Sequence, residues 1–149
     1  GLIGLIEAID YLEEITWSDI RAHIDVLSGY LYEQLKSLSF VQPILPWYQQ
    51  SSMSAEVAPI IQCPSLVSLN FAGIDCHHVA SLLHDNDMVL QAGTHHVAPF
   101  HHALNLDASL RISLGLYNDF DDIDRLVKSL REINDIVNNE ALIFAQSEP

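Results

Sequence analysis

The stretch LRISLGLYND, Leu110–Asp119, alternates apolar and polar side chains. In an extended strand successive side chains point to opposite faces. One face would carry Leu110, Ile112, Leu114 and Leu116, and the other would carry Arg111, Ser113 and Gly115. The pattern predicts a strand over 110–116 with one face in a core and one face free. The loop QAGTHHVAP, Gln91–Pro99, precedes this strand and contains two adjacent histidines.

The rest of the chain supplies segments that could pack around this strand. Apolar residues at helical spacing predict helices over 2–15, 18–39, 75–84, 99–104 and 119–138. Short alternating or apolar runs predict strands over 41–45, 66–71 and 88–91. Because alternating strands offer one apolar face, the helices are expected to cover one face of the sheet. We predict an α+β fold: a two-layer sandwich with a mostly antiparallel sheet and helices on one face.

Local signals place several boundaries. Ser18, Asp75 and Asn118 are the predicted N-caps of the second, third and last helices. Pro43 restricts the strand 41–45 to a sheet edge, because proline cannot donate a ladder hydrogen bond. Residues 46–64 are predicted to form a long hairpin connection, and residues 141–149 a frayed tail.

Length and composition exclude several classes of function. A chain of 149 residues is expected to form one domain. Its formal net charge of −14 argues against nucleic acid and anionic membranes, since both require a cationic surface. The two distant cysteines, Cys63 and Cys76, fit reduced thiols, and the chain has neither a signal peptide nor a membrane span. We therefore expect a cytoplasmic protein. The start at Gly1, inside a helix and without methionine, predicts a piece of a longer protein.

Arg111 is the first candidate site residue. It lies between apolar neighbours on the free face of the predicted strand. A guanidinium group can bind a carboxylate through two parallel hydrogen bonds, which suits an amino-acid or keto-acid substrate. The alternative is an arginine of an edge strand that pairs with a nearby aspartate.

The histidines are the second candidate. His95 and His96 are followed by His101 and His102, but adjacent histidines usually point apart and no cysteine or carboxylate with ligand spacing lies among them. A metal site is therefore not predicted. One histidine could act as a base or stack on a ligand, or all could be solvated loop residues. Neither a nucleophile elbow nor a glycine-rich phosphate loop is present.

The segments QAGTHHVAP and FHHALNLDASLRISLGLYNDFDDIDRLVKSL together resemble the C-terminal part of class V aminotransferase-like enzymes. The group II cysteine desulfurases and selenocysteine lyases are the most similar members, with their motif R-[AT]-G-x-H-C-A-Q-P and a following R-[AI]-S-x-x-x-Y-N strand. The opening GLIGLIEAIDYLEEI resembles the helix that joins their two domains.

The resemblance implies a small domain from a pyridoxal-phosphate enzyme of fold type I. Residues 1–16 would be the linking helix and 17–140 the small C-terminal domain. Arg111 falls on the arginine that binds the substrate carboxylate, His95 on the histidine of the H-C pair, and Asn118 on the asparagine of Y-N. The cofactor would be bound by a large domain of the same protein, which carries the Schiff-base lysine. A homodimer and a sulfur-acceptor protein are the further partners implied.

The chain departs from the family motif at three positions of the loop. His96 stands where the family has its nucleophilic cysteine, and an imidazole cannot carry a persulfide. Gln91 replaces the arginine, and Ala98 replaces the glutamine. Two hypotheses follow. The chain is either part of an enzyme that works without this cysteine, or a non-catalytic interaction domain derived from such an enzyme. In either case this chain alone would be catalytically incomplete.

Overall fold

The computed structural model describes residues 1–44 and 65–147, with side chains through Asn139. The elements follow the predicted order: α1 (Leu2–Ile15), α2 (Trp17–Lys36), β1 (Val41–Pro43), β2 (Leu66–Phe71), α3 (Cys76–His84), β3 (Gln91–Gly93), α4 (Ala98–Ala103), β4 (Ser109–Ser113) and α5 (Phe120–Ser147). The predicted connection over 46–64 lies outside the described residues.

The strands form one sheet in the order β1-β2-β4-β3, and every neighbouring pair is antiparallel. The strand on which the sequence prediction depended, β4, lies inside the sheet between β2 and β3. The proline-containing β1 lies at an edge, as its missing donor requires. The predicted antiparallel α+β architecture is therefore confirmed.

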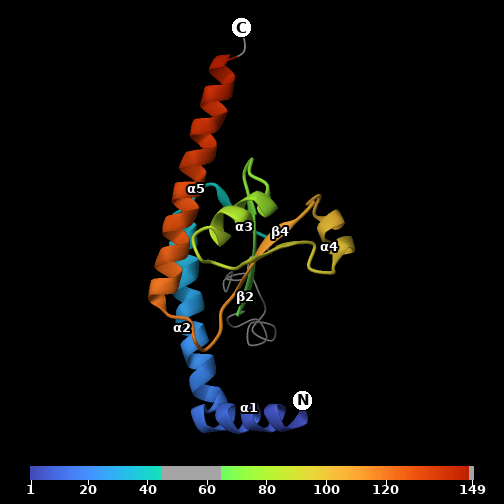
Figure 1. Ribbon diagram of the computed structural model, residues 1–149, viewed down its shortest axis with the longest axis vertical. Coiled ribbons are helices and arrows are strands. Elements are labelled where there is room, and N and C mark those ends of the chain that lie inside the picture. The colour runs from blue at the N-terminus through green and yellow to red at the C-terminus, as the bar shows by residue number, and fades with distance from the viewer. Residues whose placement is uncertain (45–64, 148–149) are drawn as a thin grey trace, which may run out of the picture.

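The hydrophobic core lies on one face of this sheet. Helices α2, α3 and α5 cover that face, and α4 lies apart from them near the beginning of β4 (Figure 1). Leu69 of β2 and Leu110 of β4 are fully buried, and Leu31 and Leu83 meet them from α2 and α3. The predicted apolar stripe of α5 is buried from Ile123 to Ile133. The fold therefore has two layers, a sheet and the helices that cover one of its faces.

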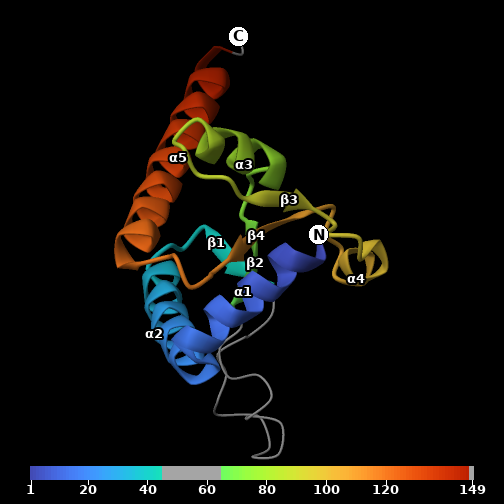
Figure 2. The same ribbon diagram turned by 60° about the horizontal axis from the view of Figure 1, so that its bottom comes forward.

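Helix α1 buries none of its residues. It runs at a steep angle to α2 and extends away from the core (Figures 1 and 2). Most of its apolar residues are exposed in the described structure, with Leu2 at 75% and Ile3 at 78%, whereas Leu12 and Ile15 are half-buried. A row of exposed aliphatic side chains is unfavourable in water and typical of a surface that meets another protein segment.

Two predicted helix caps are wrong, one by two residues and the other by one residue. Thr16, and not Ser18, caps α2, because its hydroxyl accepts a hydrogen bond from the Asp19 amide at 3.3 Å. At α5 the Asp122 amide donates to the Asp119 carboxylate at 3.0 Å, and the Asp119 amide donates back to Asp122 at 3.4 Å. This reciprocal pair is a capping box, which displaces Asn118 from the predicted cap position.

Two predicted strand boundaries also differ. Strand β3 covers Gln91–Gly93 and not 88–91, because its register pairs Gln91 with Arg111 and leaves the preceding residues free of the sheet. Strand β4 ends at Ser113, because the chain then turns: the Gly115 amide donates to the Asn118 side chain at 2.9 Å.

The C-terminal helix α5 continues to Ser147, and residues 148 and 149 lie outside the described residues. The predicted frayed tail and the predicted domain boundaries stay predictions. None of the helices described in 1–44 and 65–147 is long and apolar enough to cross a membrane.

The packing around β4 gives a first prediction. Leu110 is 0% exposed, so Leu110→Ala should lower the free energy of unfolding by about 2–5 kcal/mol through lost transfer energy and the cavity left behind. Val89, at 86% exposed, is the control, and Val89→Ala should change stability by less than about 0.5 kcal/mol. Urea unfolding followed by circular dichroism measures both. Equal effects would contradict the placement of the core.

Candidate functional site

The free face of the sheet carries a row of polar side chains across three strands. Arg111 of β4 is paired in register with Ser68 of β2 and with Gln91 of β3. Directly opposite residues on antiparallel strands project to the same face and lie close together. Arg111 therefore lies in the middle of the sheet, which excludes the alternative of an edge-strand arginine.

Arg111 has a buried donor with no acceptor among the described residues. Its Nε atom is buried and makes no hydrogen bond within the described residues, and none of the ion pairs found there includes Arg111. By comparison, Arg125 on α5 lies 3.9 Å from the Asp122 carboxylate. An unsatisfied buried donor on a cationic group is costly, and an anion at this position would satisfy it.

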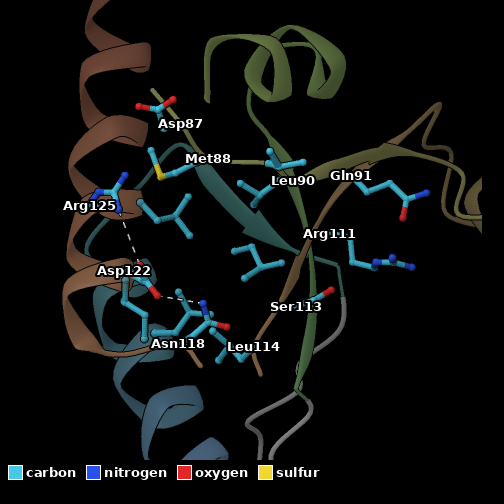
Figure 3. Close-up of a pocket in the computed structure, with 15 residues that line it drawn as sticks. Asp87, Met88, Leu90, Gln91, Arg111, Ser113, Leu114, Asn118, Asp122 and Arg125 are labelled. Atoms are coloured by element: carbon cyan, nitrogen blue, oxygen red, sulfur yellow. Dashed lines mark hydrogen bonds and ion pairs between the residues drawn. The ribbon is translucent and has the colours of Figure 1, made fainter. Parts of the chain in front are cut away.

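A cavity of about 580 Å³ lies beside this row, between β4, the segment that leads into β3, and the start of α5. Arg111 and Gln91 project to the same side of the sheet, and Asp122 and Arg125 lie on α5 across the cavity (Figure 3). Ile112, Leu114 and Leu126 are among the apolar residues of its lining. The cavity therefore has a mainly apolar lining between β4 and α5, and the side chains of Arg111 and Gln91 extend from the sheet away from α5 (Figure 3).

Asn118 lines the same cavity, but its side chain already has partners. Its Oδ1 accepts from the Gly115 amide at 2.9 Å, and its Nδ2 donates to Asp122 at 3.0 Å. Asn118 lies on the α5 side of the cavity, away from Arg111 (Figure 3). The contacts support a role in shaping the turn, and substrate binding by Asn118 stays a prediction.

The loop after β3 makes a tight turn through its two histidines. His95 and His96 have φ angles of 50° and 63°, and the Val97 amide donates to the Thr94 carbonyl at 2.8 Å. Positive φ at both central residues defines a type I′ turn, which usually contains asparagine and glycine. Such backbone conformations are uncommon for histidine and are often found at functional sites. The His96 side chain is exposed at the tip of this turn.

His95 is bound to the sheet by Ser109. Its Nε2 lies 3.1 Å from the Ser109 carbonyl oxygen and 3.0 Å from the Ser109 hydroxyl. Ser109 and Arg111 are two residues apart on β4 and therefore share the free face. Burial lowers the pKa of His95 below its usual 6.5, partly opposed by the hydrogen bond to Ser109, and the charge of Arg111 lowers the pKa further. His95 and Arg111 therefore lie near one another on the free face, and this environment favours the neutral form of the His95 imidazole.

The sequence did not single out Ser109, which is fully buried and contacts two histidines. Its position two residues before Arg111 was the available signal, but the predicted strand began one residue later. His101 is 2% exposed, whereas His102 is exposed. The described residues contain no group of three or more histidine, cysteine or carboxylate side chains arranged for a metal ion.

Comparison with known proteins identifies the family to which the chain belongs. Residues 1–126 match the model of the aminotransferase class-V family. The chain belongs to this family. It is 36% identical over 134 residues to a probable cysteine desulfurase of Halobacterium salinarum, covering 90% of this chain and 29% of that protein. A cysteine desulfurase of Haloferax volcanii is 28% identical over 128 residues, covering 86% of this chain and 27% of that protein.

A solved structure supports the same assignment. The apo structure of a cysteine desulfurase from Thermococcus onnurineus matches with a TM-score of 0.77 and 25% identity, over 89% of this chain and 30% of that chain. The class-V aminotransferase chain described here thus spans about a third of the length of the relatives that it matches. Cysteine desulfurases and class-V aminotransferases are pyridoxal-phosphate enzymes, as the resemblance predicted.

The environment of His95 predicts a pH dependence. Because the folded pKa lies below 6.5, the unfolded chain binds the proton more readily, and His95 should reduce stability progressively as the pH falls below about 6.5. An NMR titration should give a midpoint for His95 below 6.5. His95→Gln should lose less stability on acidification than the parent chain, whereas His102→Gln, which alters an exposed ring, should follow the parent chain. A midpoint above 6.5 would contradict burial as the dominant cause.

Proposed function

We propose that this chain is the small C-terminal domain of a pyridoxal-phosphate enzyme of the cysteine desulfurase type, in which Arg111 binds the substrate carboxylate. The observation that supports this role is the position of Arg111. It lies in the interior strand β4 on the uncovered sheet face, with a buried Nε donor that has no partner among the described residues. A carboxylate placed there would accept from the guanidinium in the bidentate geometry that arginine favours.

The cofactor itself does not fit this chain alone. Pyridoxal phosphate requires a lysine for its Schiff base, and the sequence contains only Lys36 and Lys128. Lys36 lies 3.3 Å from Glu33 and over the ring of Tyr32, and Lys128 lies 3.8 Å from Glu132; both belong to helices on the covered side of the sheet. The lysine and the phosphate site would therefore come from the rest of the protein.

The remaining part of the protein is also the proposed partner of α1. The chain covers 29% of the Halobacterium relative, and the apolar face of α1 is left exposed. We infer that this face packs against the large domain, with α1 as the linking helix. A homodimer and, for a desulfurase, a protein that accepts sulfur belong to the same proposal for the complete protein.

The exposed imidazole of His96 limits the chemistry that is proposed. In the alignment by motif, His96 occupies the position of the family's nucleophilic cysteine, and it projects from the tip of the type I′ turn. An imidazole cannot take up a sulfur atom as a persulfide. The proposed reaction is therefore one in which the leaving group departs without thiol attack, with His95 and His96 lining the substrate pocket.

The role of Arg111 can be tested in the complete protein. Arg111→Ala should reduce kcat/KM for an amino-acid substrate about ten- to a hundredfold, because a charge-assisted hydrogen bond contributes about 1.5–3 kcal/mol. Arg125→Ala, which removes the other arginine of the cavity lining, is the matched control and should have a smaller effect. Steady-state kinetics across several amino acids measure both.

The same measurement distinguishes the two hypotheses. An unchanged KM in Arg111→Ala would reject the carboxylate role. Absence of turnover in a complete protein that contains the cofactor lysine would instead favour a non-catalytic interaction domain, a hypothesis suggested by the replacements at Gln91, His96 and Ala98.

The proposed consequence of the His96 replacement can be tested by restoring the thiol. When the complete protein with its cofactor is incubated with L-cysteine, the natural sequence should form no persulfide on the peptide that contains residue 96. The His96→Cys variant should instead gain the mass of one sulfur atom there, with the carbon skeleton of cysteine released as alanine. Cys76 is 3% exposed, and burial raises its pKa, so it serves as an internal unreactive control. Mass spectrometry of digested protein reads both sites. If an otherwise active His96→Cys variant gained no sulfur on this peptide, the turn would not present position 96 to substrate.

A further inference from the structure

Three polar side chains from three elements meet beneath the histidine turn. His95 comes from the turn, His101 from α4 and Ser109 from β4. The Ser109 hydroxyl lies 3.0 Å from His95 Nε2 and 2.9 Å from His101 Nε2, and Ser109 and His101 are 0% and 2% exposed. The His95 and His101 rings are 5.9 Å apart between centroids. Buried groups at these distances form one hydrogen-bonded unit, which we call the His95–Ser109–His101 network.

The backbone partners determine where each proton lies. A carbonyl oxygen can only accept, so the 3.1 Å contact with the Ser109 carbonyl requires a proton on His95 Nε2. The 3.3 Å contact of His101 Nδ1 with the Val97 carbonyl likewise requires a proton on Nδ1. A neutral His101 then has a lone pair on Nε2, which accepts the Ser109 hydroxyl proton. Every one of these contacts is satisfied in this one arrangement.

We propose that Ser109 and His101 are positioning residues that hold His95 as its neutral Nε2–H tautomer. His101 accepts from Ser109, and the hydroxyl, turned toward His101, can only accept from His95. The opposite tautomer would place a lone pair of His95 against the Ser109 carbonyl. It would also leave a proton on His95 Nδ1, which is buried and has no partner among the described residues.

The network also explains how the turn is held. His95 and His96 adopt left-handed conformations that histidine seldom occupies, and the Nε2 contacts of His95 join this turn to β4. A neutral His95 adds no charge beside Arg111 on the same sheet face. That consequence for carboxylate binding rests on the proposed function, but the tautomer itself does not.

The parent chain provides the first test. Long-range proton–nitrogen NMR spectra of the ¹⁵N-labelled chain, recorded at a pH above 7, distinguish the tautomers of each ring. The two rings should differ: His95 protonated on Nε2, and His101 protonated on Nδ1. The same tautomer on both rings, or Nδ1–H on His95, would overturn the proposal.

Variants test the positioning role. His101→Met removes the acceptor, so the Ser109 hydroxyl can turn and donate to His95 Nε2, and the Nδ1–H form of His95 should appear. Adding Ser109→Ala removes this competing donor, and His95 should return to the Nε2–H form through the carbonyl alone. His102→Gln, at the exposed neighbour of His101, should leave the tautomer unchanged. A merely structural role would not predict the reversal in the double variant, and an unchanged tautomer in a folded His101→Met would reject the proposal. The parent spectra remain decisive if the variants do not fold.

Discussion

The alternation of side chains along β4 is the constraint on which the rest of the structure depends. Leu110 and Ile112 point into the core, so Ser109 and Arg111 must point to the opposite face. A shift of register by one residue would bury the guanidinium among apolar helices and expose the leucine, at a large cost in both directions. The packing energy of the core thus fixes the position of the polar row. The candidate site and the hydrophobic core therefore use opposite faces of the same strand, β4.

Because β4 is an interior strand, the backbone of the residues on its free face is held in a defined position. Hydrogen bonds to β2 on one side and β3 on the other fix the backbone of Arg111, and Ser68 and Gln91 lie directly opposite it. A side chain on an interior strand starts from a rigid backbone, so less ordering remains to be done when an anion binds. The loop that carries His95 is joined to the same strand through Ser109, two residues away. Strand and loop are therefore coupled through short contacts.

The periodic parts of the chain could be predicted from the sequence, and contacts between distant segments could not. Alternation identified β4 and the free face of Arg111, and helical spacing identified the buried stripe of α5. The caps at Thr16 and Asp119 were missed because several neighbouring residues are equally good cap formers, and only the tertiary path of the chain selects one. The Ser109 contacts join residues 8 and 14 positions apart on different elements, with no local pattern to reveal them. The only sequence signal for Ser109 was its position two residues before Arg111.

The histidine turn shows why those distant contacts matter. Two consecutive left-handed residues that are not glycine cost about 1–3 kcal/mol each, and such a conformation persists only where its surroundings fix it. The buried Ser109 and His101 provide that surrounding, because moving His95 away would leave buried polar groups without partners. The exposed His96 side chain makes no comparable hydrogen bond within the described residues, although its φ of 63° is also left-handed. In the described part of the chain, the side-chain hydrogen bonds that join this turn to the sheet therefore come from His95 and not from position 96.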